Sequence, residues 1–151
     1  MSKEDSGHTG HRPQVTGHRQ QALKKGAEGT GLMKGADICI RLVRFAAACL
    51  KIAERLPKHA AGRHVGMQLV RSGTGGGSNY EEARAAESAA DFAHKTLIAA
   101  KEVREAVYWL SVLQNAGWLA AEIATLVSEA GHLAAILAAS ARTARRRIPP
   151  P

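Results

Sequence analysis

Apolar residues recur at alternating spacings of three and four positions in four segments of the chain. This spacing places them on one face of an α-helix, and it predicts helices over about 37–56, 60–86, 88–115 and 120–145. The predicted core rows are Ile38, Leu42, Phe45, Cys49, Ile52 and Leu56; Val65, Leu69, Ser72, Gly76, Asn79, Ala83 and Ala86; Phe92, Thr96, Ala99, Val103, Ala106, Leu110 and Leu113; and Leu119, Ile123, Leu126, Ala130, Leu133 and Leu137. Because short connections join four long amphipathic helices, the pattern predicts an all-α fold, an antiparallel up-down-up-down four-helix bundle.

Local signals mark the ends of these helices. Asp37 is expected to cap the first helix, since its carboxylate can accept hydrogen bonds from the free amides of the first turn, and Pro57 ends that helix. Ser88 and Asp91 resemble a capping box that opens the third helix. Gly117 is expected to close the third helix, and the prolines at the C-terminus stop the fourth.

The segments outside the helices differ from them in composition. Residues 1–36 contain seven glycines, scattered histidines and no apolar periodicity, so they are predicted to form a disordered tail. No cysteine or carboxylate set completes a metal site around His8, His11 and His18, and neither a metal nor another cofactor is predicted. The predicted organisation is a tail over 1–36, a bundle over 37–147 and a proline-rich end over 148–151.

Length and composition narrow the class of protein. A chain of 151 residues fits one domain with tails. Aromatic residues make up only 4% of the chain while small and aliphatic residues are plentiful, which favours packed helices over a β-sandwich. No uninterrupted apolar run reaches the ~18 residues that cross a bilayer, and the N-terminus lacks the apolar segment of a secretory signal. We therefore expect a cytoplasmic protein without a membrane partner.

The two cysteines lie in the first predicted helix. Cys39 and Cys49 are ten residues apart, and a rise of ~1.5 Å per residue separates them by roughly 15 Å. That separation is too long for a disulfide. Both are predicted to be small buried apolar residues of a reducing compartment.

The net charge of +8 is concentrated at the two ends of the chain. Residues 1–36 hold six Lys or Arg and three acids, and residues 140–151 hold four Arg and no acid. The stretch between them holds eleven Lys or Arg and ten acids, so it is nearly neutral. Binding to nucleic acid would therefore depend on the ends of the chain or on local patches of the helices.

Four glycines interrupt the second predicted helix between residues 73 and 77. Each one destabilises a helix by about 1 kcal/mol relative to Ala. The run could be a loop that binds phosphate, or a stretch of small residues that lets neighbouring helices approach closely. It lacks the Gly-Lys-Ser/Thr ending of a nucleotide-binding loop, which favours close packing in a weakened or kinked helix.

A dense polar signature lies between residues 68 and 95. Its members are Gln68, Leu69, Arg71, Ser72, Gly73, Thr74, Asn79, Tyr80, Glu82, Ala83, Arg84, Ala86, Ser88, Asp91, Phe92 and Lys95, followed by Lys101, Glu102, Glu105, Tyr108, Trp109 and Leu110 and, near the end, by Ser140, Arg142, Thr143, Ala144 and Arg145. This order resembles a small bacterial four-helix-bundle family named for proteins encoded in 23S rRNA intervening sequences and related to accessory proteins of diversity-generating retroelements. The resemblance covers roughly residues 38–147, although relatives tend to have a less glycine-rich segment at 73–77.

The resemblance carries expectations that periodicity alone cannot give. It implies assembly into a ring-like homopentamer, and it implies that some relatives bind nucleic acid through a basic surface. The family has no settled biochemical activity. It also implies that the signature defines the bundle, with Arg71, Asn79, Tyr80, Glu82, Arg84, Asp91, Lys95 and Glu102 as structural residues.

The residues of the signature agree with a structural role. Glu82 has no second carboxylate or histidine at helical spacing, so it makes a poor acid–base site. Such clusters more often satisfy themselves through carboxylates that bridge to Arg or Lys around a buried Asn. We therefore predict a protein that is not an enzyme.

Candidate nucleic-acid contacts come from two groups of arginines. Arg142, Arg145, Arg146 and Arg147 cluster at the end of the fourth helix, where they could bind phosphate or could serve the helix dipole and solubility. No aromatic residue is interleaved with them to stack bases. Arg41 and Arg44 lie off the core row of the first helix, on either a solvated face or a basic stripe that contacts phosphates.

Two apolar stripes lie outside the core rows. In the third helix Trp109 follows Lys95 and Glu102 on one stripe, and in the fourth helix Val127 and Ala134 widen the apolar face. A single bundle would leave them partly exposed, so they are candidate contacts between subunits.

Two functional hypotheses follow. The first is an oligomeric accessory protein that binds RNA or DNA, acting on structured RNA such as ribosomal RNA or on a reverse-transcriptase complex. The second is a structural adaptor that recognises another protein and has no nucleic-acid role.

Overall fold

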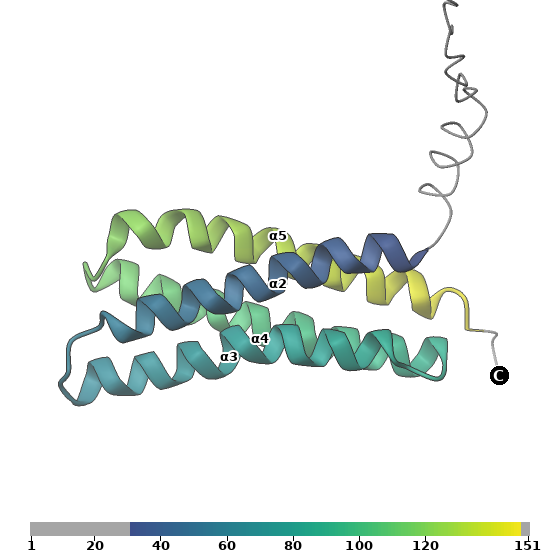
Figure 1. Cartoon of the computed structure of the whole chain (residues 1–151), viewed down its shortest axis with the longest axis horizontal. Helices are drawn as coiled ribbons and strands as arrows, with labels where there is room; N and C mark the ends of the chain where they lie inside the picture. Colours follow the sequence, from purple (N-terminus) through teal and green to yellow (C-terminus); the bar gives the residue numbers. More distant parts are fainter. Residues whose placement is uncertain (1–30, 149–151) are drawn as a thin grey trace, which may run out of the picture. The chain divides into compact units, whose positions relative to one another are not determined.

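The computed structural model describes residues 31–148, with side chains from residue 35 onward. It consists of four helices, α2 (Gly31–Glu54), α3 (Ala60–Arg84), α4 (Ala89–Asn115) and α5 (Ala120–Arg145), and the described residues contain no strand. Figure 1 shows these helices lying lengthwise beside one another, with tight turns between them. The predicted all-α class is confirmed, and the four predicted helices are present in the described residues.

Contacts between helices give the direction of each one. Gly66 near the start of α3 adjoins Leu56 just after α2, whereas Gly77 farther along α3 adjoins Leu42 at the middle of α2. These two helices are therefore antiparallel. Arg71 pairs with Glu105 while Gly75, farther along α3, adjoins Glu102, earlier in α4, so α3 and α4 are also antiparallel. The Arg41–Glu129 and Arg55–Glu122 pairs show the same for α2 and α5. The predicted up-down-up-down arrangement is confirmed.

The core consists of the predicted rows of apolar side chains. Its largest fully buried apolar members are Phe45, Leu42, Leu69, Leu110, Leu113, Ile123, Leu133, Leu137 and Val103. Burial of each large aliphatic side chain stabilises the fold by about 1.5–3 kcal/mol. Ile38, Phe92, Leu119 and Leu126 were predicted in the same rows but are only partly buried, at the margin of the core.

The first helix begins earlier than predicted. α2 starts at Gly31, so Asp37 lies inside the helix rather than at its N-cap, and residues 31–36 of the predicted tail are helical. The backbone at Gly35 lies close to Tyr80 and Arg84 of α3, and this packing extends the helix beyond the point where composition suggested an end. The predicted disorder of residues 1–30 and the three tail histidines lie outside the described residues, as do residues 149–151.

The glycine-rich stretch is a continuous part of α3. An ideal Cβ on Gly73 would lie 2.7 Å from Sγ of Cys49, and one on Gly76 would lie 2.5 Å from Cγ2 of Val103. Glycine is therefore required where α3 approaches α2 on one side and α4 on the other. The close-packing interpretation is confirmed, and the prediction of a weakened or kinked helix is not, because the segment is α-helical throughout.

The turns use the local chemistry expected of them, with one addition. The Oγ atom of Ser88 accepts a hydrogen bond from the amide of Asp91 at 3.1 Å, as predicted for the start of α4. After α4, Gly117 adopts a left-handed conformation (φ 74°), and the amides of Gly117 and Trp118 return to carbonyls of the last turn. His59 caps α3 by accepting a hydrogen bond from the amide of Gly62 through Nδ1, which the sequence analysis did not anticipate.

One helix within residues 31–148 is long and apolar enough to cross a membrane by length and composition alone, and it is α5. Core helices of soluble proteins pass the same test. Ile123, Leu133 and Leu137 of α5 are fully buried against the other helices, and Glu122 and Glu129 interrupt its apolar sequence. This composition is weak evidence for a membrane, and the expected absence of a membrane partner stays a prediction.

Candidate nucleic-acid interface

Four arginines at the end of α5 form the C-terminal arginine cluster, which we define as Arg142, Arg145, Arg146 and Arg147. All four are exposed. Ala141 and Ala144 of the same turns are buried, and the amide of Arg147 donates to the carbonyl of Ala144 at 3.0 Å. The cluster therefore lies on a helix end that is packed against the bundle, with its guanidinium groups in solvent.

The arginines of the cluster lie next to one another and have no carboxylate partner among the described residues. Within residues 35–148 none of its members forms an ion pair, whereas four arginines of the helix bodies do. Those pairs are Arg41–Glu129, Arg55–Glu122, Arg71–Glu105 and Arg84–Glu81. The helix dipole stabilises positive charge at a helix C-terminus. It does so without placing a carboxylate next to the four guanidinium groups. The cluster is thus available to an external anion.

A hollow of about 760 Å³ adjoins the cluster. It is lined by Arg147, by Ser88 and Phe92 at the start of α4, and by Ile136 and Ser140 of α5, among other residues. The free amides at the start of α4 and the guanidinium of Arg147 both favour an anion. Glu87 also lines the hollow and opposes one.

Arg41 is paired with a carboxylate of α5. Its guanidinium donates two hydrogen bonds to the carboxylate of Glu129, at 2.8 and 3.0 Å. These bonds hold the pKa of the Glu129 carboxyl below its ordinary value. The two residues are 88 positions apart in the chain, so no local sequence signal indicates the pair. The phosphate-binding role predicted for Arg41 stays a prediction, and a phosphate would have to compete with the carboxylate of Glu129.

Arg44 is exposed and has no ion-pair partner among the described residues. It does not join the C-terminal arginine cluster. Arg41 lies level with Glu129, and thirteen residues of α5 separate Glu129 from Arg142, which is roughly 20 Å of helix. The two predicted groups of arginines therefore lie at separate places on the bundle.

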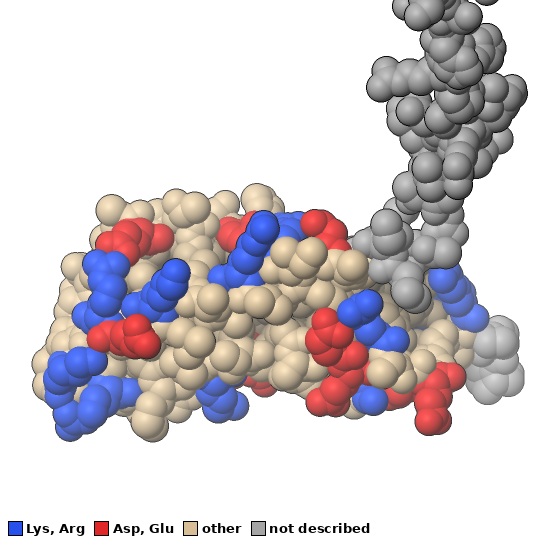
Figure 2. Space-filling view, viewed as in Figure 1, with Lys and Arg blue, Asp and Glu red and all other residues tan. Residues whose placement is uncertain are grey.

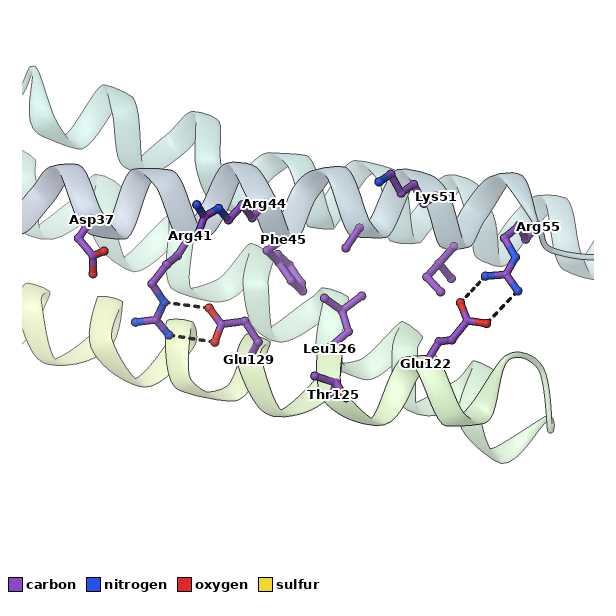
Figure 3. A pocket seen from close by; sticks show the side chains of 12 residues that line it. Asp37, Arg41, Arg44, Phe45, Lys51, Arg55, Glu122, Thr125, Leu126 and Glu129 are labelled. Carbon is purple, nitrogen blue, oxygen red and sulfur yellow. Dashed lines mark hydrogen bonds and ion pairs between the residues drawn. The ribbon is translucent and has the colours of Figure 1, made fainter.

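A groove between α2 and α5 was not predicted. It encloses about 720 Å³, and its floor includes Phe45, Ile52 and Leu126. Figure 3 shows the Arg41–Glu129 and Arg55–Glu122 ion pairs bridging the two helices, one toward each end of the groove. The sequence does show that Glu122 and Glu129 lie seven positions apart, on the same face of α5. Their arginine partners on α2 could be assigned only from the fold.

The signature residues have structural roles, but not the network predicted. Arg71 reaches across to Glu105 of α4. Asn79 is only partly buried, and its amide donates to the carbonyl of Gly75 in its own helix at 2.8 Å. Glu82 is exposed and makes no ion pair within residues 35–148. A carboxylate bridge around a buried Asn is therefore absent.

The remaining members of the signature act locally. Asp91 and Lys95 pair within α4 at 3.4 Å, and Tyr80 is buried between helices. The side chain of Glu102 lies against the backbone at Gly75, where an added Cβ would lie 2.8 Å from Oε2. That contact again depends on the small residues of α3.

Neither cysteine has the environment of a reactive thiol. Burial raises the pKa of Cys49 to about 12. Burial and the neighbouring Glu81 also raise the pKa of Cys39, even though Arg84 donates a long hydrogen bond of 3.5 Å to its sulfur. The described part of the chain contains no group of three or more His, Cys, Asp or Glu side chains suited to a metal ion.

The predicted subunit contacts divide between surface and core. Trp109 is partly buried, with its Nε1 donating to Glu105 at 3.4 Å and its ring against those of His64 and Tyr108. Tyr108 itself is exposed. Val127 is partly buried against the core. Ala134 is only 8% exposed, so its predicted place in a subunit interface is wrong because its side chain is used inside the bundle.

Comparisons with known proteins agree with this fold. Residues 36–139 match the sequence model of the 23S rRNA-intervening sequence proteins. A crystal structure of a protein of unknown function from Bacteroides thetaiotaomicron, from the S23 ribosomal protein family, is similar over 73% of this chain and 99% of that one, with 27% sequence identity and a TM-score of 0.66. A search of curated proteins found no match.

Proposed function

The chain belongs to the 23S rRNA-intervening sequence protein family, and we propose that it is a non-enzymatic accessory protein that binds nucleic acid through the C-terminal arginine cluster. One observation carries this proposal: four neighbouring arginines at one helix end are all exposed and form no ion pair within residues 35–148, whereas four arginines of the helix bodies are paired with carboxylates. The proposed ligand is structured RNA, such as ribosomal RNA, or the RNA of a reverse-transcriptase complex. The proposed place of action is the cytoplasm.

Such an interface would read the phosphate backbone and not the bases. Guanidinium groups on a helix end reach phosphate oxygens and displace condensed counterions, which gives affinity that falls steeply with salt. No aromatic side chain is interleaved with the cluster to stack on bases. Binding is therefore expected to tolerate changes of nucleotide sequence.

Assembly of several copies would strengthen this weak patch. We propose a ring-like homopentamer, in which each subunit contributes one cluster and the copies bind one nucleic acid together. The exposed ring of Tyr108 beside Trp109 on α4 is the surface we assign to contacts between copies. Aromatic side chains are enriched at such interfaces.

The test compares variants that are matched in charge. Arg145→Ser/Arg146→Ser removes two cations from the cluster, and Lys58→Ser/Arg63→Ser removes two exposed cations around the start of α3. We expect the first variant to bind an RNA hairpin at least tenfold more weakly than the second at low salt, with unchanged circular dichroism in both. Equal affinities would show that overall charge, and not the cluster, determines binding.

A protein adaptor is the second candidate function, because α2 exposes aliphatic side chains that nucleic acid does not need. High salt and nuclease treatment distinguish the two functions. A protein partner held through aliphatic contacts stays bound at high salt and after nuclease treatment, whereas a complex held through nucleic acid does not survive either one.

A further inference from the structure

A second apolar row runs along α2, on the side that faces solvent. Ile40, Val43, Ala47 and Leu50 repeat spacings of three and four and are all exposed, with Val43 65% exposed. The core row of the same helix, which includes Leu42, Phe45, Cys49 and Ile52, is buried. A helix with apolar rows on two faces is typical of one that is covered on both. We call the exposed row the outer row of α2.

The outer row continues into a hollow beside α3. This hollow encloses about 500 Å³, and its lining includes Leu50 and Ala53 of α2 and Met67 and Val70 of α3. Six large hydrophobic side chains are exposed among the described residues, and four of them, Ile40, Val43, Leu50 and Met67, lie on this one face. They therefore form a patch and are not scattered singly. Figure 2 shows an uncharged area over the middle of α2.

Two cations border the outer row. Arg44 and Lys51 are exposed, and neither forms an ion pair within the described part of the chain. They lie seven residues apart, which is about 10.5 Å along the helix. Between Asp37 and Glu54 the sequence of α2 contains no acid. The face is therefore an aliphatic row with a positive edge, and Glu54 lies at the C-terminal end of the row.

A two-fold contact between copies of this chain does not complement that edge. A two-fold contact through α2 would bring Arg44 and Lys51 of each copy against the same cations of the other. The other exposed large hydrophobic residues in the described chain are Tyr108, which shares a helix face with Lys101 and Arg104, and Ile148, which follows the C-terminal arginine cluster. Those surfaces are also positive.

The chain's own N-terminal segment and nucleic acid fit this face no better. Residues 1–36 hold twice as many Lys or Arg as acids. Nucleic acid would meet aliphatic side chains that neither stack on bases nor contact phosphate. We infer that the outer row of α2 docks an amphipathic helix of a partner protein, one that carries an aliphatic row and two acidic residues seven positions apart that face Arg44 and Lys51.

This geometry specifies the bound helix. Aliphatic side chains at heptad spacing pack between those of the outer row, and one of them enters the hollow beside Met67. Carboxylates one heptad apart match the separation of Arg44 and Lys51. The aliphatic contacts supply most of the affinity, and the two ion pairs determine which sequences bind and in which direction they lie.

The probe is a labelled helical peptide of about three heptads, with Leu in the apolar row and Glu at the two positions that face the cations. A second peptide carries Lys at those two positions. Binding to the full chain is followed by fluorescence anisotropy. We expect the Glu peptide to bind at least tenfold more tightly than the Lys peptide, and Val43→Asp/Leu50→Asp to weaken it at least tenfold.

Charge reversal gives the decisive comparison. Arg44→Glu/Lys51→Glu is expected to invert the preference, so that the Lys peptide binds more tightly. The matched control Lys101→Glu/Arg104→Glu on α4 should leave the preference unchanged. Equal binding of both peptides, a failure of the Glu peptide to bind, or inversion by the control would overturn the inference.

Light scattering of the same variants tests whether a second copy of this chain occupies the outer row instead. Because the outer row is assigned to a different protein, Val43→Asp/Leu50→Asp should leave the mass of the protein in solution unchanged. A fall in mass would assign this face to a second copy and overturn the inference. The peptide should also bind the Arg145→Ser/Arg146→Ser variant with unchanged affinity, which separates this site from the proposed nucleic-acid interface.

Discussion

Replacing Gly76 of α3 by alanine adds one methyl group where α3 and α4 approach each other most tightly. The new Cβ would lie 2.5 Å from Cγ2 of Val103, a side chain that is fully buried. Overpacking of a core contact by one carbon destabilises a protein by about 1–3 kcal/mol. The better helix propensity of alanine offsets about 1 kcal/mol of this, so the net change in the free energy of unfolding is a loss of about 1 kcal/mol.

Two other glycines serve as controls for the expected effect of Gly76→Ala on the free energy of unfolding. Gly131 of α5 has no atom within 4 Å of an added Cβ, and Gly77, next to Gly76, meets only Leu42 at 3.8 Å, an ordinary contact. Alanine at either position should stabilise the fold by about 1 kcal/mol, since only the propensity term remains. Adjacent glycines in one helix are therefore expected to give opposite signs.

The assay is urea unfolding followed by far-ultraviolet circular dichroism at one fixed protein concentration, because assembly would otherwise contribute to stability. Val103→Ala alone should destabilise by roughly 2 kcal/mol through the cavity it leaves. The double variant Gly76→Ala/Val103→Ala should be more stable than the sum of the single changes by about 1 kcal/mol, since the new methyl group occupies space that the valine vacates. If Gly76→Ala stabilises the protein as much as Gly131→Ala, the close approach of α3 and α4 is refuted.

Three further predictions concern single groups. Burial raises the pKa of Cys49 to about 12 and leaves its sulfur inaccessible, so Ellman's reagent should not modify Cys49 in the native protein but should modify both it and Cys39 in denaturant. Ser88→Ala removes the cap of α4 and should destabilise by about 1 kcal/mol, with Ser88→Asp restoring most of the loss in urea unfolding. The pKa of Glu129 is lowered in the folded state by Arg41, so its contribution is present above the unfolded pKa of about 4.3 and is lost as the pH falls through the folded value. The stability gap between the native protein and Arg41→Ala should therefore narrow on acidification below about pH 5, and a constant gap would contradict the ion pair.

Helical periodicity predicted the fold because each helix buries one face. Spacings of three and four mark the row from Leu42 to Ile52 in α2 and the row from Ile123 to Leu137 in α5. Both rows are buried except for Leu126, which is partly buried. The bounds of α5 agree with the prediction at both ends. The start of α2 did not, and Gly35 there lies against Tyr80 and Arg84 of α3. Contact with a distant segment leaves no local signal in the sequence.

The candidate site was less accessible to sequence reasoning, since charge alone does not say which cations are paired. Arg41 and Arg44 look alike in the sequence, yet only Arg41 meets a carboxylate from another helix. Ala134 and Val127 share a stripe, yet one is buried and the other partly exposed. The outer row of α2 has the same spacing of three and four as a core row, so it can be recognised in the sequence. The structure was needed to show which of the two rows is buried and which is exposed.

The salt dependence of RNA binding tests the central claim most directly. The logarithm of affinity for an RNA hairpin falls linearly with the logarithm of salt concentration, with a slope of roughly 0.7–0.9 per phosphate contact. Replacement of the four arginines of the C-terminal arginine cluster by serine should weaken binding at low salt and reduce that slope by up to about 3 per subunit, with unchanged circular dichroism. An unchanged affinity and slope in the variant would contradict binding through this cluster.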